Sequence, residues 1–281
     1  MIALIRTELY KATNRMRTLV IAALLVGLPT LIVFAIKAHG RGRSVDDGEG
    51  LFRLAQQSGY LVPAAVLSVM SGFLLVVIAG TFAGDSVAGD SSWGNLRYLL
   101  MRPVPRGRLL AAKAIVAGIL IWAATILVTL TSLVGGVVVF GGHSLTVPGF
   151  GAFATAGLPV GFHLGPSALL LRLGIATAYV AFGFTALLAL GMLFSVLTDS
   201  AAGAIGATVG VYIVSEILDG ISQLGEVRYF FPTHYMDSWS TMFTNNQYAH
   251  DMVTGALLQV AYLVVFGTLA TVWFRRKDIR S

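Results

Sequence analysis

The chain has 281 residues, of which 56% are hydrophobic and only 11% are charged, and its mean hydropathy is +0.81. A soluble domain carries about 25% charged residues, so this composition excludes a water-soluble globular protein and predicts one that is solvated largely by lipid. The net charge of +6 then indicates orientation in a membrane and not nucleic-acid binding, and the absence of cysteine excludes disulfides and thiolate metal sites.

Residues 1–17 have the periodicity of an amphipathic helix. The apolar side of the helical wheel consists of Ile2, Ile5, Leu9, Ala12 and Met16. Lys11 lies across from them, and Glu8 and Arg15 lie alongside. We expect an interfacial helix along the cytoplasmic leaflet. The alternative is an ordinary basic flank of the first membrane span.

A membrane-crossing helix needs roughly 20 mostly apolar residues, and six stretches of the sequence meet this condition. They are residues 18–36, 60–83, 114–140, 173–197, 201–218 and 256–274. The fifth is short and holds Glu216 near its end. The first is too long for the apolar region of a typical signal peptide and lacks a convincing cleavage site. We therefore predict an all-α integral membrane protein with a single transmembrane domain over residues 1–281.

The basic residues predict how these spans are oriented. With the N-terminus in the cytoplasm, most of the 19 lysines and arginines fall on the cytoplasmic side. Those that fall outside are Lys37, Arg41, Arg43, Arg53 and Arg228, with Arg172 at the outer start of the fourth span. Because cytoplasmic loops carry an excess of basic residues, we expect both termini to be cytoplasmic and the protein to lie in the plasma (inner) membrane.

A short basic segment, residues 84–113, separates the second and third spans. Asp90 or Ser91 can cap the start of a helix, and Pro103 and Pro105 end that helix because proline cannot continue the hydrogen-bond ladder. Its apolar face consists of Trp93, Leu96, Leu99 and Leu100, and its basic exit of Arg102, Arg106, Arg108 and Lys113. The pattern fits an interfacial helix held by anionic lipid, or a helix that docks into a groove of a cytoplasmic protein.

The sequence GNLRYLLMRPVPRGRLLAAK, from Gly94 to Lys113, resembles the signature of permease subunits of type-two ATP-binding-cassette exporters. In that family a G-T-x-x-x-L-L-x-x-P-[IV]-x-R run precedes a lysine at the start of the next span, and Asn95 stands here where threonine is commoner. Three further parts of the chain are similar to the family: the turn at Asp199, the outer FFPTHY from Phe230 to Tyr235, and the ending FRRKDI from Phe274 to Ile279.

The resemblance implies that two copies of the chain pair in the bilayer and recruit two cytoplasmic ATPase subunits. Residues 1–17 would be the family's elbow helix, and the helix within residues 84–113 would be the coupling helix, seated in an ATPase cleft. The residues implied in coupling are Ser91, Trp93, Gly94, Leu96, Arg97, Leu99, Leu100, Arg102, Pro103 and Arg106. Closure of the ATPases would then tilt the spans between inward-open and outward-open states.

The resemblance also implies a dimer contact and an outer gate. Family members pack spans one, two and five near the two-fold axis, so Gly206 and Gly210, at GxxxG spacing in the fifth span, become a candidate dimer contact. Packing within one chain is the alternative. Re-entrant helices cap the exit in the family, which implies an outer gate at Phe230, Phe231, Pro232 and Tyr235. Aromatic residues also mark any membrane interface, which is a second interpretation of that segment.

The sequence has no G-x-x-x-x-G-K-[ST] phosphate loop, so we expect ATP and Mg on a partner subunit and no cofactor on this chain. H-E-x-x-H and G-x-S-x-G motifs are also missing, and no two of the five histidines have the helical spacing of metal ligands. Charges within the spans are few, which argues against an ATP-independent transporter or channel. That class stays the alternative, and an enzyme or scaffold is the third. A hydrophobic or amphipathic cargo is the default substrate.

Overall fold

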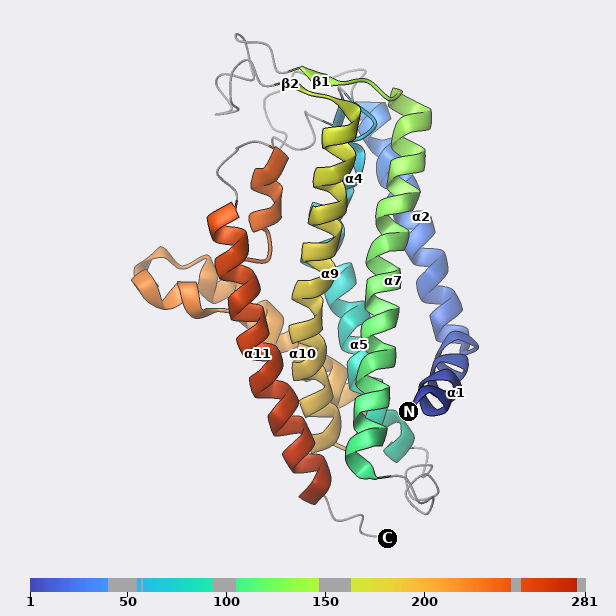
Figure 1. Cartoon of the computed structure of the whole chain (residues 1–281), viewed down its shortest axis with the longest axis vertical. Coiled ribbons are helices and arrows are strands. Elements are labelled where there is room, and N and C mark those ends of the chain that lie inside the picture. Colours follow the sequence, from blue (N-terminus) through green and yellow to red (C-terminus); the bar gives the residue numbers. More distant parts are fainter. Residues whose placement is uncertain (40–54, 57, 93–104, 147–162, 244–248, 277–281) are drawn as a thin grey trace.

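The computed structural model describes residues 1–39, 55–56, 58–92, 105–146, 163–243 and 249–276. Within them the chain forms an elongated bundle of helices that run alternately up and down (Figure 1). Its α-helices are α1 (Ile2–Thr13), α2 (Met16–His39), α4 (Val62–Gly72), α5 (Leu74–Ser92), α7 (Arg106–Phe140), α9 (Pro166–Leu197), α10 (Ala201–Asp219) and α11 (Ala249–Arg276). Two 3₁₀ helices, η1 (Ser222–Phe230) and η2 (Ser238–Phe243), lie between α10 and α11 in the sequence.

Six of these helices are long and apolar enough to cross a membrane, namely α2, α5, α7, α9, α10 and α11. The predicted helical class and the number of long apolar helices are therefore confirmed. A small antiparallel sheet was not expected. In it β1 (Leu145–Thr146) pairs with β2 (His163–Leu164), next to the end of α7 and the start of α9.

The structure divides the predicted second span, residues 60–83, into two helices. α4 ends at Gly72, and Phe73 leaves the helical conformation with φ −141° and ψ −57° before α5 begins. Ser71 and Gly72 precede the break, and pairs of glycine and serine are a recurrent cause of sharp kinks. α5 then continues to Ser92, beyond the predicted end of the span.

α5 and α9 form the centre of the bundle. In α9, 78% of the most apolar stretch is buried within the chain, compared with 17% in α11. Small residues allow close packing here. A Cβ atom built on Gly84 of α5 would lie 2.9 Å from the backbone nitrogen of Ile205 in α10, and one built on Gly191 of α9 would lie 2.6 Å from the Cβ of Ala83. Close approach of this kind stabilises helix packing in lipid, where burial of apolar surface contributes little.

The outer helices α2, α10 and α11 present apolar side chains on the outside of the bundle. Phe34 of α2, Ile217 of α10 and Leu257 and Trp273 of α11 are all exposed in the single chain. A contiguous apolar surface of this kind requires contact with hydrocarbon or with another apolar face. The exposed surface thus agrees with a multi-pass membrane protein.

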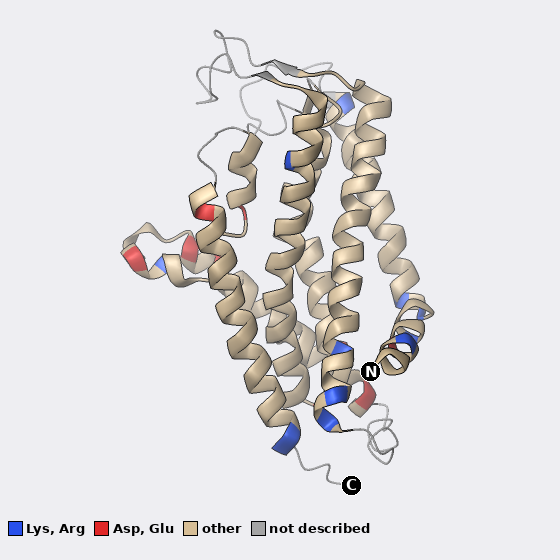
Figure 2. Ribbon diagram, in the orientation of Figure 1, with Lys and Arg blue, Asp and Glu red and all other residues tan. Residues whose placement is uncertain are grey.

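Basic residues gather toward one end of the bundle, which we call the charged end. Figure 2 shows lysine and arginine around α1, on the first turns of α7 and on the last turn of α11, while the middle of the bundle carries few charges. The start of α2, the end of α5 and the turn between α9 and α10 lie toward the same end (Figure 1). α1 and the end of α11 therefore share one end of the bundle, as an even number of crossings requires.

Candidate functional site

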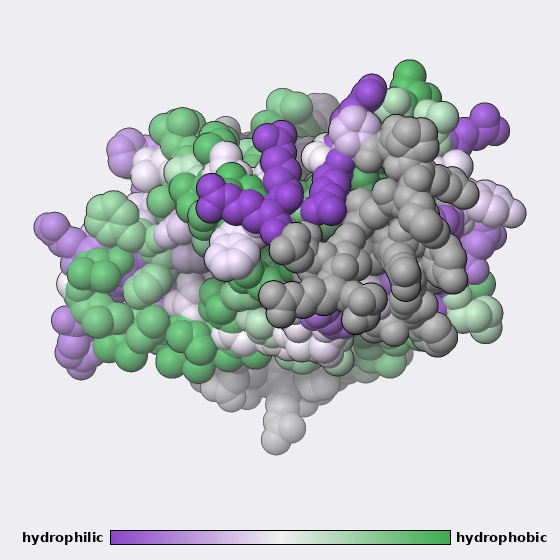
Figure 3. All heavy atoms as spheres, turned by 90° about the horizontal axis from the view of Figure 1, so that it is seen from below, coloured by the Kyte–Doolittle hydropathy of each residue, from purple (hydrophilic) through white to green (hydrophobic). Residues whose placement is uncertain are grey.

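The charged end is where α5 ends and α7 begins, on either side of residues 93–104, which lie outside the described residues. Seen from this end, a group of hydrophilic side chains lies toward the upper middle of the surface, with mostly apolar side chains to its left (Figure 3). The flanks of the basic segment predicted to couple to a partner are thus part of this surface. The ion pairs beneath it show how the flanks are held.

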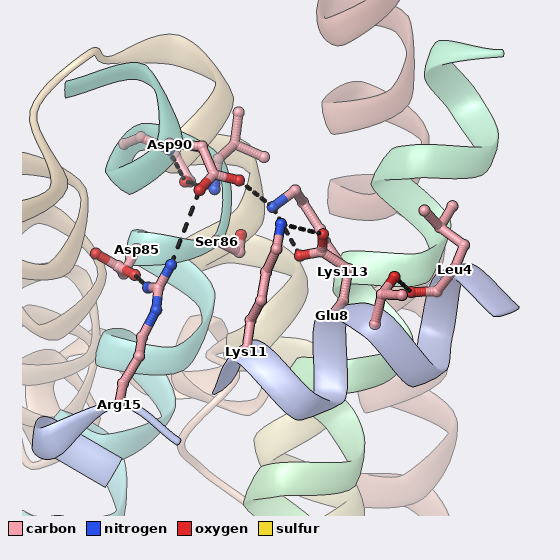
Figure 4. A network of polar contacts seen from close by, with 12 residues as sticks. Leu4, Glu8, Lys11, Arg15, Asp85, Ser86, Asp90 and Lys113 are labelled. Carbon is pink, nitrogen blue, oxygen red and sulfur yellow. Dashed lines mark hydrogen bonds and ion pairs between the residues drawn. The ribbon is translucent and has the colours of Figure 1, made fainter. Parts of the chain in front are cut away.

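Lys113 of α7 is the centre of an ion-pair network. Only 5% of its side chain is exposed, and its Nζ lies 3.1 Å from a carboxylate oxygen of Glu8 in α1. The same ammonium pairs with Asp90 near the end of α5, so it lies between two carboxylates (Figure 4). A buried charge is costly unless it is paired and hydrogen-bonded. Here one lysine satisfies that condition by joining three helices.

Two arginines at the corner between α1 and α2 extend the network. Arg15 lies 2.6 Å from a carboxylate oxygen of Asp85 in α5 and 3.8 Å from one of Asp90. Arg17, in the first turn of α2, also pairs with Asp85. Figure 4 shows Arg15 reaching from the corner toward α5. The corner is therefore held to α5 by these pairs, while α1 is held to α7 through Lys113.

Glu8 is the one buried residue of α1. Burial acts to raise the pKa of its carboxyl, but the charges and hydrogen bonds of Lys113, and then of Lys11 at 3.2 Å, bring the pKa below its usual value. Glu8 is therefore ionised at neutral pH. The helical wheel indicated only that Glu8 lies beside the apolar face. It could not reveal the buried lysine that pairs with Glu8, because that lysine stands 105 residues further along the chain.

Ser195 of α9 holds the part of α5 that contains Asp85 and precedes Asp90. Its hydroxyl accepts hydrogen bonds from the backbone N–H groups of Val87 at 3.0 Å and Ala88 at 2.8 Å. It donates one to the carbonyl of Gly84 at 2.6 Å. Gly84 and Ala88 have the spacing of one intrahelical hydrogen bond, and side chains inserted at such a pair can bend a helix. No sequence motif marks Ser195, because its partners are backbone groups of another helix.

Two of the residues implied in coupling belong to the described part of the chain. The Ser91 hydroxyl donates to a carboxylate oxygen of Asp199, 2.9 Å away in the turn between α9 and α10. Arg106, the first residue of α7, donates to the backbone carbonyl of Arg275 in the last turn of α11 at 3.4 Å. The other implied residues lie outside the described ones: Trp93, Gly94, Leu96, Arg97, Leu99, Leu100, Arg102 and Pro103.

The helix start expected at Asp90 or Ser91 is not what the structure has. α5 runs through both residues to Ser92, so neither of them begins a new helix. Asp90 instead directs its carboxylate to Lys113. At the far side of the segment, Pro105 is the N-cap of α7, with φ −57° and ψ 131°, so it precedes a helix that begins earlier than the predicted third span.

Gly206 and Gly210 lie on α10, on a face that no other described helix covers at these positions. Neither glycine, if given a Cβ atom, would bring that atom within 4 Å of a described residue beyond its immediate surroundings. Packing against another helix of the same chain, the alternative to a dimer contact, therefore finds no support among the described residues. The two glycines are open to lipid or to a second subunit.

Away from the charged end, hydrogen bonds hold residues 222–243, which we call the outer segment. The Tyr179 hydroxyl of α9 donates to the backbone carbonyl of Tyr235 at 2.7 Å. The Gln259 amide of α11, a buried side chain, donates to the carbonyl of Pro232 at 2.6 Å. Two long helices thus fix the backbone of the outer segment directly.

Side chains add a third helix to this attachment. The hydroxyls of Ser215 in α10 and Thr233 are 2.8 Å apart, and both residues are buried. His234 Nδ1 lies 2.5 Å from a carboxylate oxygen of Asp219 at the end of α10. Trp239 of η2 is fully buried. The outer segment is therefore fastened to α9, α10 and α11, and η2 anchors it in the core.

The four residues of the implied outer gate all lie in this segment. Phe230 is 69% exposed, and its backbone carbonyl accepts a hydrogen bond from Tyr262 of α11. Phe231, Pro232 and Tyr235 are half-buried. The Tyr235 ring packs edge-on against His234 with ring centroids 4.6 Å apart. The segment is thus oriented mainly through its backbone carbonyls, while the Phe230 ring stays available at the surface.

Within the described ranges, no group of three or more histidine, aspartate or glutamate side chains could hold a metal ion. The residues that sequence reasoning missed at the charged end are Glu8, Asp90 and Ser195, whose buried roles depend on partners from distant helices. Sequence reasoning also missed Gln259 of α11, which holds the outer segment. A polar residue in an otherwise apolar span is the signal that could have drawn attention to Gln259.

Comparison with known proteins identifies the family. No curated protein matches the sequence closely enough to count as a relative. The family model described as "ABC-2 family transporter protein" matches residues 2–279, nearly the whole chain. Members of this family are membrane permeases that lack an ATPase domain. The match extends over all six long apolar helices and both flanks of the basic segment, and the chain therefore belongs to the ABC-2 family of transporter membrane proteins.

Proposed function

We propose that this ABC-2 membrane subunit is an exporter permease driven by ATP hydrolysis on two separate cytoplasmic ATPase subunits. The observation that carries the proposal is the ion-pair network at the charged end. It fastens both flanks of residues 84–113, the segment that resembles the coupling motif of the family. ATP and Mg belong to the partner subunits in this account, and this chain binds no cofactor.

The proposed orientation puts the charged end and both termini in the cytoplasm, with the chain in the plasma (inner) membrane. Support comes from the concentration of lysine and arginine around α1, α7 and the end of α11 (Figure 2), because basic residues stay on the cytoplasmic side. α1 is then the elbow helix along the inner leaflet. The end of α5 and the start of α7, which flank residues 93–104 in the sequence, then lie on the cytoplasmic side, where an ATPase subunit can reach them.

The contacts around the segment give a route for motion into the bundle. If α5 and α7 shift at the charged end, α1 must move with them, because otherwise the ion pair between Lys113 and Glu8 would break. The Ser91–Asp199 hydrogen bond would carry the same displacement to the turn between α9 and α10. ATP-bound and nucleotide-free partners must hold the coupling helix differently for this to shift the conformational equilibrium. The bundle would then alternate between inward-open and outward-open states.

The proposed assembly is a homodimer that contacts through α10. Gly206 and Gly210 support it, since neither has a close neighbour on another described helix and small residues let two helices approach closely. Gly206→Leu should therefore fold but lose the dimer, as measured by cross-linking or mass photometry in nanodiscs. Gly267→Leu on α11, where a Cβ also meets nothing within 4 Å, is the matched control and should stay dimeric. Equal dimer content in both variants would exclude this contact.

The outer segment is the proposed outer gate, and the cargo is hydrophobic or amphipathic. Phe230, Phe231, Pro232 and Tyr235 lie where α9 and α11 hold the segment by its backbone. An apolar cargo that leaves the bundle would meet aromatic side chains there. The apolar character of the long helices supports this cargo class.

Co-purification tests the coupling proposal. Trp93→Ala and Arg106→Ala should weaken the complex with the ATPase subunit and reduce ATP-dependent transport. Trp273→Ala and Arg108→Ala are matched controls, because Trp273 is exposed on the outside of α11 and Arg108 is exposed on the first turn of α7. If Trp93→Ala and Arg106→Ala both leave complex and transport intact, residues 84–113 are not the coupling segment.

The second candidate is an ATP-independent transporter or channel. It predicts transport that persists under a proton gradient with no ATPase subunit present. The ionic network described above lies at one end of the bundle and not in its middle, where coupling charges of such transporters are expected (Figure 2). A scaffold, the third candidate, would show no transport even with its partners present.

A further inference from the structure

A partly open cavity of about 50 Å³ lies between the corner of α1 and α2 and the helices α5 and α7. A buried water needs about 10–15 Å³ by the same kind of measure, so the cavity can hold a group larger than one water. Its wall includes the basic side chains of Lys11, Arg15 and Arg17. These three side chains are 49%, 40% and 35% exposed, so a ligand can reach them from outside, although Nε of Arg17 is itself buried.

The cavity changes from charged to apolar along α7. Lys113 is at one end of the wall and Leu120 at the other, about two helical turns or 10 Å apart. Phe82 of α5 and Val116 complete the apolar part. A soluble anion would use only the charged part. An amphiphile with an anionic head and a hydrocarbon tail matches both parts.

The charges around the cavity do not cancel. The network has four basic members and three acidic ones: Lys11, Arg15, Arg17 and Lys113, against Glu8, Asp85 and Asp90. One positive charge is therefore left over, and Arg15 and Arg17 share the single carboxylate of Asp85. A phosphodiester carries one negative charge and would neutralise the cluster.

One nitrogen also lacks a partner. Nε of Arg17 is buried and has no hydrogen-bond partner among the residues that the structure describes. A buried donor without a partner costs free energy, and phosphate oxygens are strong acceptors for a guanidinium. The missing acceptor and the missing negative charge thus point to the same kind of ligand.

We propose that this cavity binds the phosphate group of an anionic phospholipid, with the first part of an acyl chain against Phe82, Val116 and Leu120. Lys11 and Arg17 contact the phosphate, and Arg15 stays engaged with Asp85. The lipid would then complete the junction between α1, α5 and α7. The leaflet on the cytoplasmic side is rich in anionic lipid, so the ligand is abundant where the charged end is proposed to lie. This site is separate from the ATPase contact and does not depend on it.

Native mass spectrometry of the purified full chain tests the site. The protein is titrated in detergent micelles with phosphatidylglycerol or with phosphatidylcholine of identical acyl chains. We expect the wild type to retain phosphatidylglycerol preferentially. Arg17→Gln and Lys11→Gln should each weaken that retention about tenfold, the effect of one charge-assisted hydrogen bond, with phosphatidylcholine retention unchanged. Lys11 is half exposed, so Lys11→Gln keeps the test valid if Arg17→Gln does not fold.

Arg108→Gln is the matched control, because Arg108 is an exposed basic residue on α7 that does not line the cavity. It should bind phosphatidylglycerol like the wild type. Equal retention of the two lipids, or an equal loss in Arg108→Gln and Arg17→Gln, would overturn the site. Soluble glycerol phosphate should not displace the lipid at millimolar concentration. If it does so as effectively as phosphatidylglycerol, the ligand is a soluble phosphate compound and the lipid assignment is wrong.

Discussion

Two regions of this permease, the charged end and the outer segment, are held mainly by different kinds of contact. At the charged end, Lys113, Arg15 and Arg17 join α1, α2, α5 and α7 through ion pairs. In the outer segment, Tyr179 and Gln259 hold a non-helical stretch through neutral hydrogen bonds to backbone carbonyls. The first junction connects helices to each other, whereas the second fixes the path of a loop.

The difference has a mechanical consequence. Coulomb attraction falls only as the inverse of distance, so ion pairs keep pulling when helices shift slightly. Hydrogen bonds weaken steeply when their angle is lost, so they fix an orientation and then release it. The charged end is thus suited to transmit displacement without coming apart. The outer segment is suited to stay in one orientation until its hydrogen bonds break, and then to move as a unit.

The largest effect is expected from breaking the charged junction at its centre. Lys113→Met leaves Glu8 and Asp90 buried without their shared cation, which should cost about 3–5 kcal/mol of stability. Thermal unfolding in nanodiscs measures the loss. Arg108→Met, on the exposed side of the same helix, should change little. Equal stability of the two variants would mean that the network does not hold the three helices.

A smaller effect is expected when the outer segment loses one attachment. Gln259→Leu removes the donor to the carbonyl of Pro232 and should cost roughly 1–3 kcal/mol, since that carbonyl loses its partner. Hydrogen exchange should rise within residues 222–243 and not at the charged end. Gln223→Leu, exposed on η1, is the control. If exchange rises equally in α1 and α5, the two regions are not independent.

Acid should weaken the charged end. The pKa of Glu8 is lowered from its usual value of 4.5, so its ionised form stabilises the fold above the unfolded pKa. That contribution is lost as pH falls through the folded pKa. Stability should therefore hold from neutral pH down to about 5 and decline below 4.5. The decline should be smaller in Glu8→Gln, and Glu226→Gln should follow the wild type. Parallel curves for wild type and Glu8→Gln would contradict the role of Glu8.

The smallest effect on stability is expected at Ser195. In Ser195→Ala, the Gly84 carbonyl and the Ala88 amide can bond to each other in the helix, so the loss should stay below about 1 kcal/mol. Transport should be affected more than stability, because α5 is no longer held to α9 beside the network. Thermal unfolding and ATP-driven transport of the same variant separate the two. A large drop in stability with normal transport would show that Ser195 stabilises the fold and has no special part in transport.

The sequence predicted the parts of the structure that hydropathy controls. Long apolar runs predicted the long helices, and the positions of the basic residues predicted that α1 and the end of α11 share one end. The break at Phe73 was missed because it interrupts an apolar run without a proline. The buried role of Glu8 was missed because its partner comes from the third span. Such pairings depend on tertiary contact, which local patterns do not contain.

Transport in reconstituted vesicles is the decisive experiment for ATP-driven export by this chain. Vesicles that contain this chain, the ATPase subunit and a fluorescent amphipathic cargo are compared with vesicles that lack either ATP or the ATPase subunit. We expect cargo movement only when both ATP and the ATPase subunit are present, and we expect that movement to be lost in Trp93→Ala. Movement under a proton gradient, without ATP and without the ATPase subunit, would contradict ATP-driven export.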